Sequence, residues 1–208
     1  MNRLAEIVLG DGMLCLCRFE DMEVPAFGTA CVVLIDGLSE FGRFLRVHDS
    51  FHAGKVSYSG TFLNVAGEEE LKKLAGNEEA LSRARGVLLK WIAEERRTLY
   101  ALRMRFTVRR ERLYLTLDAT DTTHFQSIFE TLEKRFQTQV SAQFLSSRAL
   151  SAVIGGMGVC GCVLCCSNGT CEQSRVEVKL AKQQMMPLHD AVAAGLCGRL
   201  KCCIAYEV

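Results

Sequence analysis

Cysteine is the residue whose number and spacing in this chain best indicate chemistry. The frame C-G-x-x-x-C-C occurs twice, as CGCVLCC from Cys160 and as CGRLKCC from Cys197. Thiolates bind soft and borderline metals, and two short cysteine arms can together supply the ligands of a zinc site or an iron–sulfur cluster. We therefore predict a metal site whose candidate ligands are Cys160, Cys162, Cys165, Cys166, Cys171, Cys197, Cys202 and Cys203.

The spacing within the two arms favours an iron–sulfur cluster, with zinc as the alternative. Zinc sites commonly use two C-x-x-C knuckles, whereas only Cys162 and Cys165 form one here. A thiol-disulfide oxidoreductase is the second alternative. The thioredoxin-like C-x-x-C opens a helix, however, and four glycines between positions 155 and 161 indicate a loop.

The neighbouring cysteines limit how many thiols one metal atom can take. On extended backbone, successive side chains point to opposite faces, so we expect Cys165 and Cys166 to reach two different sites. The principal ligands of the first site are then Cys160, Cys165, Cys197 and Cys202. The second of each cysteine pair forms a half-site that either a partner or the extra thiols Cys162 and Cys171 would complete.

The elements ahead of this region predict a small β-barrel or sandwich over residues 1–66. Short apolar runs recur between Leu4 and Val47, and turn residues separate them. Cys15 and Cys17 alternate with leucines and share a strand face with Met13 and Phe19, and Cys31 heads an apolar strand. We interpret these three cysteines as buried core residues without a function.

A second, α+β domain is predicted over residues 78–208, after a polar, glycine-punctuated linker at 67–77. Asn77 would cap its first helix. Alternating residues at 102–108 and 113–117 predict a hairpin, Asp121 or Thr122 would cap a second helix, and a further strand follows near 140–144. The fold class is α+β, with a mixed sheet and a cysteine-rich metal-binding region at 150–208.

Seven arginines lie between positions 96 and 112. They could bind RNA or an acidic protein through Arg103, Arg105, Arg109 and Arg112. Because no aromatic side chains for base stacking are interleaved with them, a solvated face is the favoured interpretation.

Composition narrows the remaining function classes. A net charge of +1 indicates neither a nucleic acid nor an anionic membrane as partner of the whole chain. The uninterrupted apolar segment at 152–166 is shorter than the ~20 residues of a membrane span. The N-terminus does not have the pattern of a secretory signal. We expect a cytoplasmic protein, where clustered thiols bind metal and do not form disulfides. No catalytic arrangement is recognisable, so we expect no enzyme.

Three segments carry a resemblance to a known family. They are IGGMGVCGCVLCC from Ile154, VEVKLAKQQ from Val176 and GLCGRLKCCIAYE from Gly195. They resemble the bacterial YaaT family, also called RicT, which are stage-zero sporulation or regulatory iron–sulfur proteins whose C-terminal domain is shared with a eukaryotic polymerase-suppressor protein. On this resemblance the family cysteines fall on Cys160, Cys165, Cys166, Cys197, Cys202 and Cys203.

The resemblance implies a regulatory or scaffold protein that is not an enzyme. Such proteins act with two small helical regulatory proteins, carry four-iron four-sulfur (4Fe-4S) clusters, and influence both RNA processing by the endoribonuclease Y and a developmental phosphorelay. This chain departs from the family in having Cys162 where an arginine is usual, and in the added Cys171. Of the charged stretch that usually precedes the first arm it retains only Arg148.

Overall fold

The computed structural model describes residues 3–20, 23–48, 60–95, 102–117, 125–167, 176–187 and 193–206. The chain forms two compact units. The first comprises Met1–Leu117 with Asp121–Gln143, and the second comprises Phe144–Val208 with Asp118–Thr120. Among the helices in the described ranges, none is long and apolar enough to cross a bilayer.

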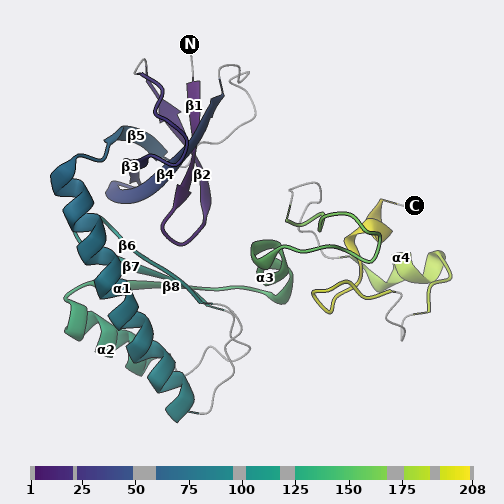
Figure 1. Cartoon of the computed structure of the whole chain (residues 1–208). Helices are drawn as coiled ribbons and strands as arrows, with labels where there is room; N and C mark the ends of the chain where they lie inside the picture. The colour runs from purple at the N-terminus through teal and green to yellow at the C-terminus, as the bar shows by residue number, and fades with distance from the viewer. Residues whose placement is uncertain are drawn as a thin grey trace. The chain divides into compact units, whose positions relative to one another are not determined.

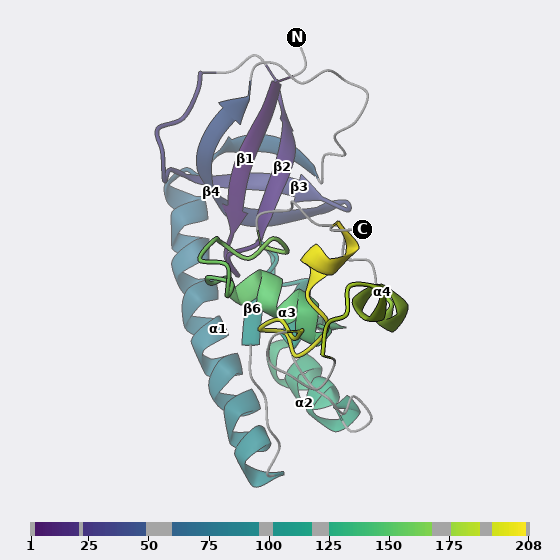
Figure 2. The same ribbon diagram turned by 90° about the vertical axis from the view of Figure 1, so that its right-hand side faces the viewer.

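The first unit begins with a closed five-stranded barrel, which confirms the predicted β-rich domain (Figures 1 and 2). Around it the strands follow the order β1-β2-β5-β3-β4. β2 and β5 pair in parallel, and the other neighbours pair antiparallel. The strands are β1 (Arg3–Leu9), β2 (Leu14–Phe19), β3 (Ala30–Ile35), β4 (Leu38–His48) and β5 (Gly60–Val65).

The core of the barrel is the side-chain layer that period-two alternation points inward. Three phenylalanine rings from three strands meet there, with centroids 5.1–6.4 Å apart. Cys15, Cys17 and Cys31 are buried beside them, as predicted. Met13, expected on the same face as Cys15, is 42 % exposed because it precedes β2 in the turn.

Helix α1 (Glu68–Glu94) begins inside the segment predicted as a linker. Residues 67–77 therefore form its start, and Asn77 is not a cap but a buried residue within the helix. Three glutamates in the first turn suit the positive end of the helix dipole, and the Gly67 N–H donates to the Glu70 carboxylate at 2.7 Å. The low helix propensity of Gly76 is a cost of about 1 kcal/mol that the long helix tolerates.

Tertiary hydrogen bonds explain why Asn77 lies inside the helix. Its side-chain amide donates to the Thr107 carbonyl at 3.1 Å, and its carbonyl oxygen accepts from Arg110 Nε at 2.6 Å. Asn77 thus fastens α1 to the following hairpin, an interaction that local sequence alone does not indicate.

The hairpin, the second helix and the last strand form a three-stranded sheet with the order β6-β7-β8, close to the predicted positions. The elements are β6 (Leu102–Phe106), β7 (Arg112–Leu117), α2 (Gln126–Phe136) and β8 (Gln139–Phe144). Helix α1 packs on α2 and β6, with Trp91 and Phe125 rings 5.2 Å apart. The predicted caps Asp121 and Thr122 lie outside the described residues.

The barrel and this sheet belong to one unit because buried polar contacts join them. Arg105 of β6 forms ion pairs with Asp11 of the β1–β2 turn and with Glu40 of β4, and Val108 N–H donates to the Ser39 carbonyl at 2.8 Å. The chain thus divides before the cysteine-rich region, at Phe144, and not at the predicted linker.

Candidate functional site

The second unit contains little regular structure and is organised around cysteine-bearing loops. Helix α3 (Ser147–Ile154) precedes the first arm, α4 (Val178–Gln183) lies between the arms, and the short 3-10 helix η1 (Cys202–Ala205) ends the second arm. Ser146 caps α3 by accepting from the Ala149 N–H at 3.3 Å. A small apolar cluster of Val176, Ala181 and Ile204 supports the loops.

The two arms, residues 157–166 and 194–203, fold into the same turn. Each arm contains an isolated antiparallel bridge, Met157 with Val163 and Ala194 with Leu200. The hydrogen bonds inside the bridges also correspond. Gly158 N–H donates to the Cys162 carbonyl at 2.8 Å, and Gly195 N–H donates to the Arg199 carbonyl at 2.8 Å. The repeated sequence frame is therefore a repeated backbone structure.

The glycine after the first cysteine of each arm is required by this turn. Gly161 and Gly198 have φ values of 77° and 70°, in the left-handed region that residues with a Cβ rarely adopt. Their N–H groups donate back to Gly158 and Gly195 at 3.0 and 2.9 Å. Cys162 and Arg199 occupy equivalent positions after these glycines, so the first arm has an additional thiol where the second arm has an arginine.

Both arms contribute thiols to one cavity of about 360 Å³. The six cysteines that line it are those carried over from the family resemblance, namely Cys160, Cys165, Cys166, Cys197, Cys202 and Cys203. Cys162 is exposed and is not among the lining residues. Cys171 lies outside the described residues. Within the described ranges, no three His, Cys, Asp or Glu side chains lie close enough together to hold a metal ion.

The neighbouring cysteines do not separate to different sites as expected. Cys165 with Cys166, and Cys202 with Cys203, line the same cavity. The expectation assumed extended backbone, whereas the first pair lies in a turn and the second begins η1. In turns and helices, adjacent side chains diverge by less than they do along a strand, so both thiols can face one space.

Apart from Ser151, the walls between the thiols are apolar or cationic. Val159, Leu164 and Leu196 are among the apolar wall residues, and Arg148 and Lys201 are the charged ones. The described lining includes no carboxylate. The cavity therefore combines soft sulfur donors with positive charge, a donor set that fits an anionic metal–thiolate group.

Two of the thiols have shifted acidities. The Cys162 backbone N–H, by hydrogen bonding to the Cys160 sulfur, lowers the pKa of the Cys160 thiol, and Lys201 of the other arm adds to this effect. Desolvation by burial raises the pKa of the Cys166 thiol, as do the charges of Cys202 and Cys197. The influence of one arm on thiols of the other shows that the arms act on a common space.

The barrel thiols are buried, and two of them have raised pKa values. Burial raises the pKa of the Cys31 thiol to about 12. The hydrogen bond with Cys15, whose sulfur lies 3.6 Å away, raises the pKa of the Cys17 thiol, and burial adds to the shift. The same hydrogen bond lowers the pKa of the Cys15 thiol. Cys17 and Cys31 are therefore protonated core residues at neutral pH.

The four arginines predicted as a partner-binding face do not share one environment. Arg105 is only 8 % exposed and is held by Asp11 and Glu40, so it is not available to a partner. Arg103 and Arg112 are half-buried, and only Arg109, in the hairpin turn, is exposed. The period-two pattern around Arg105 is that of a half-buried strand, and its burial follows from the barrel packed beside it.

Sequence reasoning missed the two cations of the cavity wall, Arg148 and Lys201. Lys201 lies within the second frame, CGRLKCC, directly before Cys202, and this position is a signal that could have identified it. Arg148 is the single charged residue of the helical segment SRALSAVI, and it is buried although charged residues are seldom buried. An isolated charge in a short apolar helix next to a metal-binding frame is a signal that could have identified it.

Comparison with known proteins agrees with the resemblance of the motifs. Residues 175–208 match the family model described as the third domain of PSP1-like protein. The chain is also 28 % identical over 145 residues to the stage 0 sporulation protein YaaT of Bacillus subtilis strain 168. That alignment covers 70 % of this chain and 53 % of the relative, so the chain spans about half the length of the curated relative it matches. No solved structure matches the chain.

Proposed function

Because this chain is related to the YaaT proteins and carries a PSP1-like third domain, we propose that it is a regulatory or scaffold subunit that holds an iron–sulfur cluster. The observation that carries the proposal is the cavity into which two repeated arms bring six thiols. The relative is named a sporulation protein, which supports a role in developmental regulation. We further propose that the chain acts in the cytoplasm and has no enzymatic activity of its own.

The number of thiols and the size of the cavity support a cluster over a single zinc ion. Structural zinc takes four ligands at about 2.3 Å, so the ion and its sulfurs fill only a small space. Here six thiols surround about 360 Å³. Iron–sulfur clusters distribute their cysteine ligands over several irons and so suit thiols that are farther apart. When bound, such a group would supply electron storage or a redox-sensitive fold.

Anaerobic purification of the full chain, followed by iron, zinc and acid-labile sulfide analysis, tests this proposal. We expect iron and sulfide in equal amounts and little zinc. Stoichiometric zinc without sulfide would instead indicate a structural zinc module. A variant with alanine at Cys15, Cys17 and Cys31 is the matched control, since it removes three thiols without touching the arms.

A thiol-disulfide oxidoreductase is the second candidate, and one observation favours it. The exposed Cys160 has a lowered pKa, as reactive cysteines do, and the side chain of Cys162 contributes a hydrogen bond to it. A thiol titration with and without reductant separates the two functions. A redox enzyme cycles one pair of thiols in the metal-free protein, whereas a cluster protein releases its thiols only when the metal is removed.

The resemblance further supports assembly with small helical regulatory proteins and an effect on an endoribonuclease. An acidic protein or RNA would meet the hairpin at Arg109 in its turn, with the half-buried Arg112 next to the turn and the half-buried Arg103 farther along β6. Replacing these three by glutamate should abolish co-purification with such a partner and leave the metal content unchanged. Unchanged association would identify the hairpin as a solvated face.

A further inference from the structure

We infer that Arg148 is the built-in counter-cation of the thiol cavity and that the same side chain fastens the second arm in place. The inference rests on the proposed function for the nature of the bound group. The contact between Arg148 and the second arm does not depend on a bound group and applies to the metal-free chain as well. Arg148 is a positioning residue in this role, because it acts on the site through charge and through the backbone of the arm.

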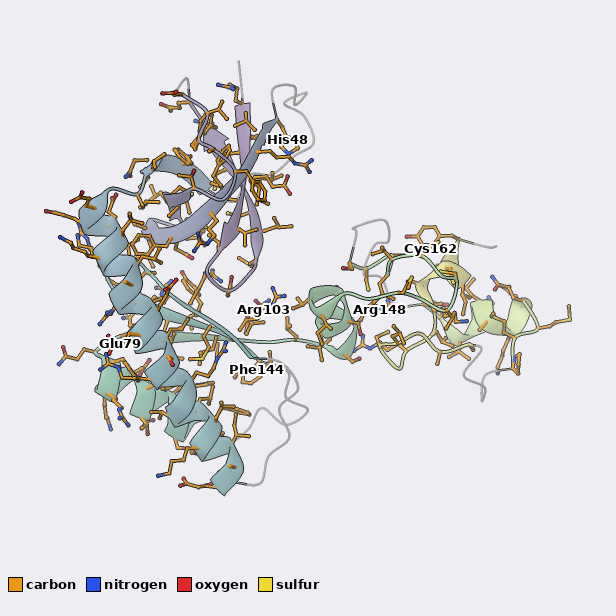
Figure 3. The ribbon with its side chains drawn as sticks, in the orientation of Figure 1. His48, Glu79, Arg103, Phe144, Arg148 and Cys162 are labelled. Atoms are coloured by element: carbon orange, nitrogen blue, oxygen red, sulfur yellow. The ribbon has the colours of Figure 1, made fainter. Side chains whose placement is uncertain are left out.

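The position of Arg148 links the two arms. It lies in α3, which leads directly into the first arm (Figure 3). Its side chain lines the cavity. Its Nη2 donates to the backbone carbonyl of Leu200 at 3.1 Å. Leu200 is the bridge residue of the second arm and is followed by Lys201 and Cys202. One side chain thus connects the helix before the first arm to the turn that presents the thiols of the second.

Arg148 brings a buried positive charge to the wall of the cavity. The residue is 5 % exposed, and a guanidinium remains charged under all ordinary conditions. The acidic groups in the described lining of the cavity are the six thiols. A thiolate or an anionic group that forms in this cavity therefore lies near a buried cation.

The charge of Arg148 would act on a group held by the thiols that line the same cavity. A cluster held by thiolates is net anionic and becomes more negative when it takes up an electron. A fixed, buried cation stabilises that reduced state more than the oxidised one, which raises the reduction potential. Burial limits the solvent screening that would weaken this effect at the surface.

Among the described residues, no other cation near the site is both buried and part of the cavity lining. Lys201 lines the cavity but is half-buried on a flexible stem, so solvent screens its charge more strongly. Arg199 is exposed and is not among the residues lining the cavity, although it adjoins Leu200 in sequence. Arg199 is therefore a matched control for Arg148, since it has the same side chain in the same unit without contact to the cavity.

The test compares the variants Arg148→Gln, Arg148→Lys and Arg199→Gln with the unchanged chain. Each full-length protein is reconstituted anaerobically with iron and sulfide, and its midpoint potential and metal content are measured. Amide hydrogen exchange at residues 193–203 is measured on the metal-free proteins. Glutamine removes the charge, whereas lysine keeps the charge but lacks the planar guanidinium that reaches Leu200.

For Arg148→Gln we expect a more negative potential, corresponding to about a tenfold weaker reduction equilibrium, or roughly 59 mV for one electron. For Arg148→Lys we expect a potential near that of the unchanged chain and at least several-fold faster exchange in the second arm. Arg199→Gln should match the unchanged chain in both measurements.

The inference is overturned if Arg148→Gln keeps both the potential and the exchange rates of the unchanged chain, or if Arg199→Gln causes the same shifts. Should Arg148→Gln fail to fold, Arg148→Met, which also removes the charge, takes its place in the measurement of the potential, and the exchange of Arg148→Lys still tests the contact with Leu200. If the unchanged chain takes up no cluster, the proposed function fails. Hydrogen exchange in the metal-free variants then still decides whether Arg148 fastens the second arm.

Discussion

Two sets of cysteines in one chain have opposite environments, and the backbone that carries them explains the difference. Cys15, Cys17 and Cys31 lie on barrel strands and are buried in a packed core. Six of the seven cysteines of the arms lie in turns or at the start of η1 and line a cavity, half-buried or exposed. Strands place a thiol among apolar side chains, whereas glycine-containing turns leave it facing open space. Burial, not residue type, determines whether a thiol in this protein can react or bind metal.

The largest effect should follow from removing one thiol of an arm. Serine at Cys197 or at the equivalent Cys160 removes a soft ligand and should strip most of the bound metal. Replacing Cys31 by alanine should leave the metal content unchanged. Metal and sulfide analysis after anaerobic purification checks both. If the serine variants at Cys160, Cys165, Cys197 and Cys202 all keep their full metal content, the arms do not hold the metal.

Cys31 of the barrel should instead affect the stability of the folded chain at alkaline pH. The pKa of Cys31 rises from 9.0 to about 12 on folding, so the folded chain holds a proton that the unfolded chain releases. This contribution to the free energy of unfolding is complete below pH 9 and is lost between about pH 9 and 12, by at most about 1.4 kcal/mol per pH unit.

Replacing Cys31 by valine, which has a similar volume, should remove this pH dependence. The difference between the two proteins is measured by urea unfolding at pH 8 to 10, followed through the single tryptophan, Trp91, of the same unit. Parallel stability curves for the two proteins across that range would show that Cys31 does not ionise differently on folding.

Alkylation of the metal-free protein should distinguish the two sets directly. Iodoacetamide reacts with thiolates, so the exposed Cys160, whose pKa is lowered, should be labelled first. Cys15, Cys17 and Cys31 should be labelled only after unfolding. Mass spectrometry of tryptic peptides over time gives the order. Labelling of barrel cysteines under native conditions at the rate of Cys160 would contradict the comparison.

The smallest effect should come from Cys162. Because its thiol does not line the cavity and the second arm has Arg199 at the equivalent position, Cys162→Arg should leave the metal content within error. The double variant with Cys171→Ser then isolates the contribution of Cys171. Iron loss in the single variant would place Cys162 among the ligands, as its position between Cys160 and Cys165 predicts.

The local sequence patterns determined much of this protein by themselves. Period-two alternation located the barrel strands, the buried barrel cysteines and the β6–β7 hairpin, and the repeated C-G-x-x-x-C-C frame located both cysteine arms. These features depend on interactions between residues a few positions apart, and such interactions leave a periodic or repeated trace in the sequence.

Tertiary structure decided the features that depend on distant partners. Asn77 became an interior residue of α1 because carbonyls of the hairpin accept its amide. Arg105 became a buried ion-pair residue because Glu40, 65 positions away, lies beside it. Arg148 became part of the cavity through Leu200, 52 positions away. A buried polar group must be paired, and its partner is set by how the elements pack, so only the folded chain shows where these charges lie.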